Sequence, residues 1–411
     1  LILTALFFVP DFGLAQDREM QFFRPNDKRG LNVFEPGKAD TVPFTGMKVQ
    51  VGGDFAIQFQ GLDHSNKMGN LVDLDKNLNL PTANLNLDVQ LFDGMRLHLR
   101  TYLSSRHHSE AWVKGGHLRI DKLDFIKPGF LSGVMEHVSI TVGLDEFNYG
   151  DAHFRRSDNA RAIFNPFVGN YIMDSFSTEP FAEVTVTKSG FLGVVGLTNG
   201  KLNQNVVLPA SNDNEVSFYG KLGYDSGEQN DFRWRLTGSV YTNQGKTTGH
   251  WLYGGDRAGS RYYGILTEEE GTPGDFEGRF NPAFNRMTAV QINPFVKYHG
   301  VEFFGIYELV SNASSSGGGS FSQYGAELLY RFGNTEQLYV GGRYNMVTGK
   351  ATSDGDEFGI DRYNLGAGWY MTKNVLAKVE YMQQTYNDWA PGTKYEGAEF
   401  SGVNIEAVIS F

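Results

Sequence analysis

Hydrophobic and polar residues alternate along most of the chain from Met47 onward, with a period of two residues. In the first such segment Val49 and Val51 lie on one face, and Lys48 and Gln50 lie on the other. This period predicts β-strands with one apolar and one polar face. Two later alternating runs are separated by Asp93-Gly94, a dipeptide that strongly favours a tight hairpin turn.

The alternation predicts about sixteen strands in all. The first three lie near residues 48–60, 84–91 and 95–104. The others lie near 112–123, 136–147, 180–188, 191–199, 215–224, 231–242, 287–298, 301–310, 321–332, 337–346, 358–370, 375–383 and 400–411.

The predicted connections alternate between short and long. Long ones cover about 62–82, 105–111, 148–179, 200–214, 243–286, 311–320, 347–357 and 384–399. An even number of antiparallel strands with this alternation predicts an all-β transmembrane barrel with short periplasmic turns and long outer loops. The alternatives are a soluble β-solenoid or a propeller, but no repeat of 20 to 50 residues supports them.

The polar face of the predicted strands carries many ionisable groups. Those expected to line the lumen are Arg96, Arg100, Arg233, Arg235, Glu302, Glu308 and Glu327. So many charges could not be desolvated together in a packed core. We therefore expect them to face water and the apolar face to meet lipid, because sixteen strands enclose enough space for an aqueous channel.

The N-terminal part of the chain differs from the rest. Residues 1–15 run apolar to Val9 and reach a small-x-small site at Gly13-Leu14-Ala15, as in part of a secretory signal peptide. Residues 16–46 lack alternation and contain three prolines, so we predict a periplasmic arm there and the barrel over 47–411. The alternative is that this arm enters the lumen as a plug.

Composition narrows the possible classes. Fifty glycines and 14% aromatic residues suit strands, tight turns and aromatic belts. The mean hydropathy of -0.34 and the lack of an apolar run of 18 residues after the N-terminus exclude a helical membrane protein. The chain has no cysteine, and its net charge of -11 argues against nucleic acid as a partner.

The last predicted strand alternates from Val403 to the terminal Phe411, and it resembles the signal that the barrel assembly machinery reads in outer-membrane proteins. The whole chain resembles a sixteen-stranded bacterial porin. The stretches Tyr149–Asn159 and Asn165–Tyr171 are similar to porin-like outer-membrane proteins of Bacteroidota. The resemblance implies an outer-membrane location among lipid and lipopolysaccharide, a homotrimer, and a third outer loop that folds inward and narrows the lumen.

If that loop corresponds to residues 148–179, the resemblance makes several of its charged residues candidates for a pore constriction. They are Arg155, Arg156 and Arg161 with Asp151, Asp158 and Asp174. Opposed charges across a constriction orient water and polar solutes. Alternatively, the arginines bind the loop to acidic wall residues such as Glu302 and Glu327, and both roles can hold together.

Other candidate chemistry is weaker. Acidic outer-loop residues could bind Ca²⁺ or Mg²⁺, or could simply be solvated; they are Glu268, Glu269, Glu270, Asp275, Glu277, Asp354, Asp356 and Glu357. His107, His108 and Glu110 could share a metal only in an irregular turn. The sequence contains no HExxH or GxSxG motif and no phosphate-binding glycine loop. We therefore expect neither a cofactor nor an enzyme.

Three functions agree with this reading. The first is a porin that gives passive diffusion of small hydrophilic solutes and ions. The second is a channel selective for phosphate, dicarboxylate or sugar. The third is a receptor or structural barrel that conducts little. The long loop at 243–286 is the reason to retain this third function.

Overall fold

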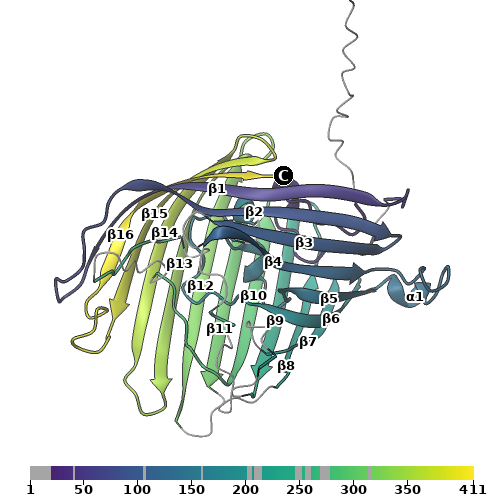
Figure 1. Ribbon diagram of the computed structural model, residues 1–411. Helices are drawn as coiled ribbons and strands as arrows, with labels where there is room; N and C mark the ends of the chain where they lie inside the picture. The colour runs from purple at the N-terminus through teal and green to yellow at the C-terminus, as the bar shows by residue number, and fades with distance from the viewer. Residues whose placement is uncertain are drawn as a thin grey trace, which may run out of the picture.

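The computed structural model describes residues 20–39, 42–104, 108–158, 161–200, 206–207, 215–245, 252–254, 261–268, 278–312 and 317–411. Sixteen antiparallel strands form a closed barrel in which each strand pairs with its neighbours in sequence and β1 pairs with β16 (Figure 1). The predicted all-β barrel of sixteen strands is confirmed.

The strands are β1 (Lys48–Ser65), β2 (Asn77–Phe92), β3 (Met95–Ser104), β4 (His108–Ile120), β5 (Val138–Glu146), β6 (Thr178–Lys188), β7 (Phe191–Thr198), β8 (Ser217–Asp225), β9 (Phe232–Asn243), β10 (Met287–Tyr298), β11 (Val301–Asn312), β12 (Gly318–Phe332), β13 (Leu338–Thr352), β14 (Phe358–Tyr370), β15 (Val375–Asn387) and β16 (Glu399–Ser410). The described helices are short: η1 (Lys28–Gly30), α1 (Ser132–Met135), η2 (Ala152–Arg155) and η3 (Ala162–Phe164).

The connections divide between two ends of the barrel. At the turn end they comprise residues 93–94, 121–137, 189–190, 226–231, 299–300, 333–337 and 371–374. At the loop end they comprise 66–76, 105–107, 147–177, 199–216, 244–286, 313–317, 353–357 and 388–398. The predicted alternation of short and long connections holds for most of the chain. The exceptions are 121–137, which is long but lies at the turn end, and 105–107, 313–317 and 353–357, which are short but lie at the loop end. The longest turn-end connection carries α1, which projects beyond the strands at the right of Figure 1.

The first and last strands close the barrel. Their register runs from Asp54 opposite Ser410 to Ser65 opposite Glu399. The backbone N–H of Gly53 donates to the Phe411 carbonyl at 2.9 Å, and the Phe411 N–H donates back at 3.1 Å. Closure gives hydrogen-bond partners to the backbone N–H and C=O groups that a free sheet edge would expose. A strand in lipid needs such partners, because no water is present to supply them.

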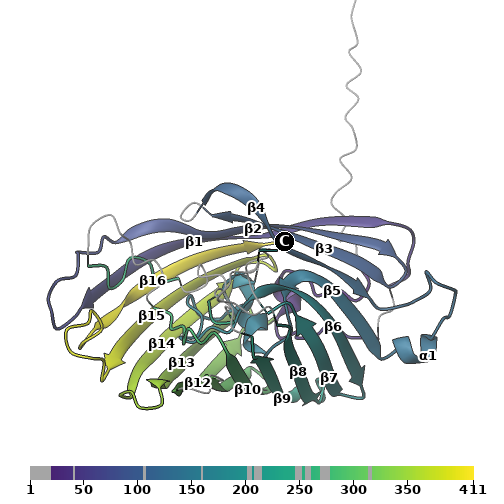
Figure 2. The same ribbon diagram turned by 60° about the horizontal axis from the view of Figure 1, so that its bottom comes forward.

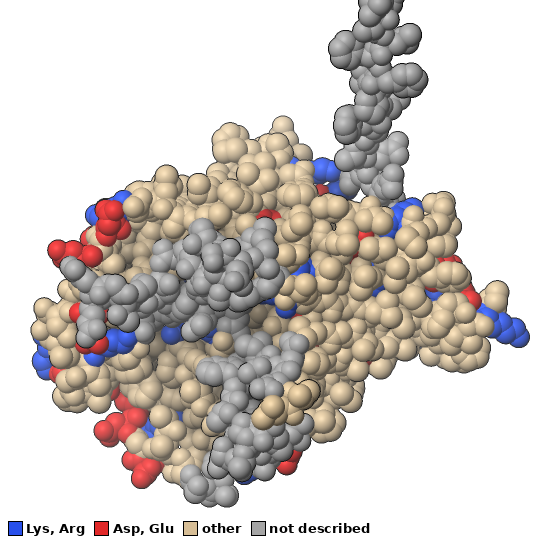
Figure 3. Space-filling view, in the orientation of Figure 1, with Lys and Arg blue, Asp and Glu red and all other residues tan. Residues whose placement is uncertain are grey.

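The outer surface of the barrel is apolar. Val195 and Leu222 are 72% and 74% exposed there, and Figure 3 shows charged groups mainly near the ends of the barrel. Exposed aromatic residues gather near the turn end, among them Phe191, Tyr298, Tyr330, Trp369 and Phe411. The predicted outward direction of the apolar face is confirmed. Among the described residues, no helix has the length and hydropathy needed to cross a bilayer.

The inside of the barrel is filled by three segments, which occupy its centre in Figure 2. They are residues 20–39, the loop 147–177, and the described parts of the loop 244–286, which make hydrogen bonds to inward-facing strand residues. Glu308 is fully buried and Arg235 is 4% exposed. The expectation that the inner charges mostly face water is therefore wrong, because these segments supply their polar partners.

The outward face of β7 provides a test of this orientation. We expect Val195→Arg to destabilise the folded barrel in lipid by about 3 kcal/mol, because an arginine near the bilayer midplane meets hydrocarbon. Val195→Leu, which stays apolar, is the control and should leave the free energy of unfolding nearly unchanged. Urea unfolding in lipid vesicles measures both variants, and equal stability would contradict the assigned face.

Candidate functional site

The loop 147–177 crosses the lumen and attaches first to β8 and β9. Asp151, which is fully buried, accepts hydrogen bonds from Arg235 Nε at 2.8 Å, Lys221 Nζ at 2.9 Å and Thr237 Oγ1 at 2.8 Å. Burial alone would raise the pKa of Asp151, but Arg235 and Lys221 outweigh it and hold that pKa below its usual value. Asp151 is therefore an ionised anchor of this loop.

A second anchor joins the loop to β11 and β12. The Arg155 guanidinium lies 2.8 Å from Glu302 and 3.0 Å from Glu327, and it also donates to Asn32 at 2.7 Å. Burial alone would lower the pKa of Arg155. The carboxylates of Glu302 and Glu327 outweigh this effect, so the pKa of Arg155 is raised above its usual value. Arg155 therefore has the second of the two roles considered in the sequence analysis, which is to bind the loop to the acidic wall residues Glu302 and Glu327.

Three further candidates form ion pairs with one another within the loop. Arg156 pairs with Asp174 at 2.7 Å and with Asp158 at 3.2 Å, and Lys114 Nζ on β4 reaches Asp158 at 2.6 Å. All four side chains are buried or nearly so. The contacts within the loop fix its conformation, and the contact with Lys114 holds it against β4.

A close backbone approach helps to seat the loop. Gly150 has φ +68°, and a Cβ there would lie 2.0 Å from Gln291 Oε1 on β10. A larger residue would be strained and would also collide with the wall. Glycine at this position therefore lets the loop approach β10 closely without displacing the Gln291 side chain.

The described residues of the loop 244–286 contact the loop 147–177 inside the barrel. Arg261 is fully buried, pairs with Glu406 on β16 at 2.9 Å and donates to the Ser157 carbonyl. Tyr253 Oη donates to Glu308 at 2.9 Å, and burial raises its pKa well above the usual value. The described part of this loop thus lies in the lumen. In the sequence analysis, the length of the loop was the reason to consider a receptor role.

Residues 20–39, which we call the arm, cross the turn end of the barrel. Gln21 Nε2 donates to Asp93 at 2.9 Å beside β3, and the Lys28 N–H donates to the Lys373 carbonyl between β14 and β15. Elsewhere the arm bonds to β9, β11 and the β4–β5 connection through Glu35, Asn32 and Lys38. This is the position of a plug, the alternative considered for this segment.

The arm is held to the wall by charge as well as by backbone contacts. Glu35 lies 2.8 Å from Arg235 and 3.2 Å from Lys221. Burial raises the pKa of Glu35, but these two cations lower it to about 2, so the carboxylate is ionised at neutral pH. Asn148 also donates to Glu35 at 3.0 Å, which ties the arm to the first inserted loop.

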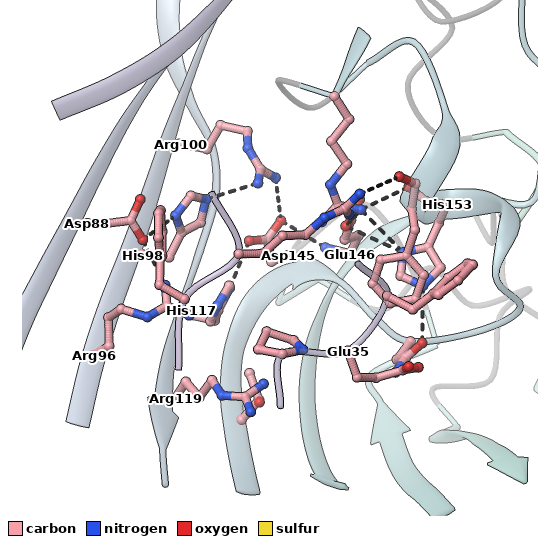
Figure 4. A pocket seen from close by; sticks show the side chains of 18 of the residues that line it. Glu35, Asp88, Arg96, His98, Arg100, His117, Arg119, Asp145, Glu146 and His153 are labelled. Atoms are coloured by element: carbon pink, nitrogen blue, oxygen red, sulfur yellow. Dashed lines mark hydrogen bonds and ion pairs between the residues drawn. The ribbon is translucent and has the colours of Figure 1, made fainter. Parts of the chain in front are cut away.

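A cavity of about 180 Å³ remains between the arm, the loop 147–177 and the wall formed by β2–β6 (Figure 4). Arg24, Phe34 and Glu35 of the arm lie on one side of it. The other lining residues used below are Arg96, His98, Arg100, His117, Arg119, Asp145, Glu146, His153, Phe154 and Arg161. Because it lies where the inserted segments leave the wall uncovered, this cavity is the candidate site.

The cavity wall carries carboxylates that are each paired with a guanidinium or an imidazole. Arg100 lies 3.1 Å from Asp145, and His117 Nδ1 lies 3.0 Å from the other oxygen of the same carboxylate. Arg161 forms an ion pair with Glu146. The side chains of His117 and Arg161 are 21% and 18% exposed, against 2% for Asp145. The guanidinium of Arg161 and the imidazole of His117 are therefore more exposed than the carboxylates that they contact.

Histidine from the loop adds a neutral polar group. Burial lowers the pKa of His153 to about 4, so its imidazole is uncharged at neutral pH. Its Nε2 lies 3.1 Å from Asn148 Oδ1. At neutral pH the loop therefore contributes one cation, Arg161, and one neutral imidazole to this cavity.

The structure separates the residues singled out in the sequence. Arg96, Arg100 and Arg161 line the cavity. Asp151, Arg155, Arg156 and Asp158 are buried at the loop contacts, and Arg235, Glu302, Glu308 and Glu327 are buried beneath inserted segments. Arg233 bonds to Asp225 and to the Asn32 carbonyl.

Sequence reasoning did not single out Arg24, His98, His117, Arg119 or His153. The alternation places His98 between Arg96 and Arg100 on one face of β3, and this is the signal that could have drawn attention to it. The remaining four lie on three other segments. Their meeting at one cavity depends on how the arm and loop pack.

The candidate cation sites fall mostly outside the cavity. Glu269, Glu270, Asp275, Glu277 and His107 lie outside the described residues, as do the side chains of His108 and Glu110. Asp354, Asp356 and Glu357 lie in the connection 353–357 at the loop end. Within the described part of the chain, no group of three or more His, Asp or Glu residues could hold a metal ion.

No protein-family model and no curated protein sequence matches the chain. Solved structures do match. The anion-selective porin from Comamonas acidovorans has a TM-score of 0.57 and 11% identity, covering 89% of this chain and 100% of that one. The outer membrane channel DcaP of Acinetobacter baumannii has a TM-score of 0.55 and 11% identity, covering 90% and 99%.

In-vitro folded OmpT, an outer membrane protein of Vibrio cholerae, has a TM-score of 0.51 and 11% identity, covering 90% of this chain and 99% of that one. The chain has the fold of bacterial outer-membrane porins. The closed barrel and its apolar outer face agree with the expected location in the bacterial outer membrane.

The anchor at Asp151 can be tested by substitution. We expect Asp151→Asn to lower the free energy of unfolding by about 3 kcal/mol, because it breaks buried pairs with Arg235 and Lys221. The same substitution at exposed Asp63, whose contact with Lys76 is 3.5 Å, should cost about 0.5 kcal/mol or less. Urea unfolding measures both, and equal effects would contradict the anchoring role.

Proposed function

We propose that this protein is an outer-membrane channel that passes small hydrophilic solutes and ions along the β2–β6 wall. The observation that carries the proposal is the polar cavity of about 180 Å³ left between that wall, the arm and the loop 147–177. Inserted segments bury the inward charges over much of the remaining wall. Passage is therefore proposed where charged side chains still meet open space.

The filled interior favours the selective channel over a general diffusion porin. A diffusion porin needs a broad aqueous lumen, whereas here the arm crosses the turn end and two loops occupy the centre. Arg161 from the loop faces a wall that carries Arg96 and Arg100, so this narrow region would discriminate by charge.

The proposal includes the finer expectations from the sequence. They are a relationship to porin-like proteins of Bacteroidota, a cleaved signal peptide, a homotrimer, contacts with lipopolysaccharide and insertion by the barrel assembly machinery. The protein is proposed to act without catalysis and without a resident cofactor. Its substrates would be small polar solutes.

Narrowing the cavity tests the permeation path. Thr141 on β5 lines the cavity, and we expect Thr141→Trp to lower single-channel conductance by roughly half or more, because it obstructs the polar path. Ser226→Trp, in a turn-end connection away from the cavity, is the control and should conduct like wild type. Planar-bilayer recording measures both. Unchanged conductance in Thr141→Trp would place the path elsewhere.

Removing the arm tests the plug. A variant lacking residues 20–39 should show a higher single-channel conductance, because the arm crosses the turn-end opening. Heat-modifiable mobility on gels checks that this variant forms the barrel. A folded variant with wild-type conductance would show that the arm does not limit flow.

A further inference from the structure

Three basic side chains that line the candidate cavity are more exposed than the carboxylates that they contact. The side chain of Arg119 is 11% exposed, and its partner Asp121 is 2% exposed. The same order holds for Arg161 in front of Glu146 and His117 in front of Asp145. A small solute entering the cavity would thus meet guanidinium and imidazole groups before carboxylates.

Arg24 differs from the other lining arginines. Within the described part of the chain it forms no ion pair, and its N–H groups donate to two carbonyls, those of Gly30 at 3.0 Å and Phe154 at 3.1 Å. Its guanidinium lies 4.0 Å from the ring centroid of Phe164. Burial and then the nearby Arg161 lower the pKa of Arg24, and the carboxylates of Glu146 and Glu35 offset this lowering only in part.

We propose that this cavity binds a small oxyanion, through a carboxylate or phosphate group, and that Arg24 is the cation that completes the site. The proposal rests on the channel function, since it names the class of solute that the narrow region holds. A guanidinium can donate two parallel hydrogen bonds to either group.

The position of Arg24 couples binding to the arm. Because the arm supplies this arginine, the site is complete only when the arm lies across the turn end. A ligand that binds the docked arm more tightly stabilises that arrangement. The bound oxyanion and the docked arm therefore stabilise each other. Release of the arm removes Arg24 from the site and also removes the obstruction at the turn end.

The size and lining limit the ligand. A cavity of about 180 Å³ is smaller than the range of roughly 300 to 1,000 Å³ usual for drug-sized ligands. Phe34 and Phe154 meet edge to face at 5.7 Å on its border. These rings offer an apolar surface to the body of a small organic acid, while inorganic phosphate would use the charged groups alone.

Calorimetry on the purified full-length barrel in detergent tests binding. The probes are sodium benzoate and sodium phosphate, titrated at constant ionic strength. We expect Arg24→Gln to weaken binding roughly tenfold to a hundredfold, as for loss of a charged hydrogen-bonding partner. Arg29→Gln, on the same arm where Arg29 pairs with Asp27, should bind within about twofold of wild type. Arg24→Lys keeps the charge and should retain more affinity than Arg24→Gln.

Limited trypsin digestion tests the coupling. Trypsin does not cut an Arg-Pro bond, so Arg24→Gln leaves the cleavage sites of the arm unchanged, because Pro25 follows Arg24. We expect the binding probe to slow cleavage after Arg29 in wild type and to have no effect in Arg24→Gln. Heat-modifiable mobility checks that each variant is folded.

Binding of benzoate alone would identify an organic carboxylate site, and binding of phosphate alone a phosphate site. Either supports the proposal if it depends on Arg24 and protects the arm. Absence of binding by both probes, equal binding by Arg24→Gln, or an arm that the probe does not protect would overturn it. These assays need no membrane potential, so their result is independent of whether the barrel conducts.

Discussion

Charged groups on the inner face of the barrel need partners, and this requirement shapes the rest of the interior. A strand with one apolar face toward lipid must turn its polar face inward. Here that face carries ions such as Glu302 and Arg235, which are buried rather than wet. The arm and the inserted loop supply Asn32, Arg155 and Asp151 to them. The contents of the barrel are therefore held mainly by paired charges and hydrogen bonds.

The barrel could be read from the sequence because its signal is local. Alternation predicts the number of strands, and three of the predicted ranges, 95–104, 287–298 and 358–370, match β3, β10 and β14 to the residue. Strands were predicted too short toward the loop end. β13 runs on to Thr352 and β15 to Asn387, where polar and small residues interrupt the alternation while backbone pairing continues.

The site could be read only in part. The polar face of β3 pointed to Arg96 and Arg100, and both line the cavity. The role of Arg24 could not be foreseen, because it depends on where an irregular arm meets Phe154 and Phe164. The sequence predicts an inward third loop and, as an alternative, a plugging arm, but it does not predict that the loop 244–286 also enters the lumen. Solvation of inner charges was assumed from their number, whereas their pairing with loops distant in sequence has no local signal.

The buried Arg261 has a consequence for the seam between the first and last strands. Its guanidinium pairs with Glu406 on β16, and its carbonyl accepts a hydrogen bond from Gln58 on β1 at 3.0 Å. One residue of the β9–β10 loop thus contacts both strands of the seam from inside the barrel. Parting these strands would therefore break either this hydrogen bond or the buried ion pair in addition to the backbone ladder. From inside the barrel, Arg261 thus adds to the resistance of the seam to lateral opening.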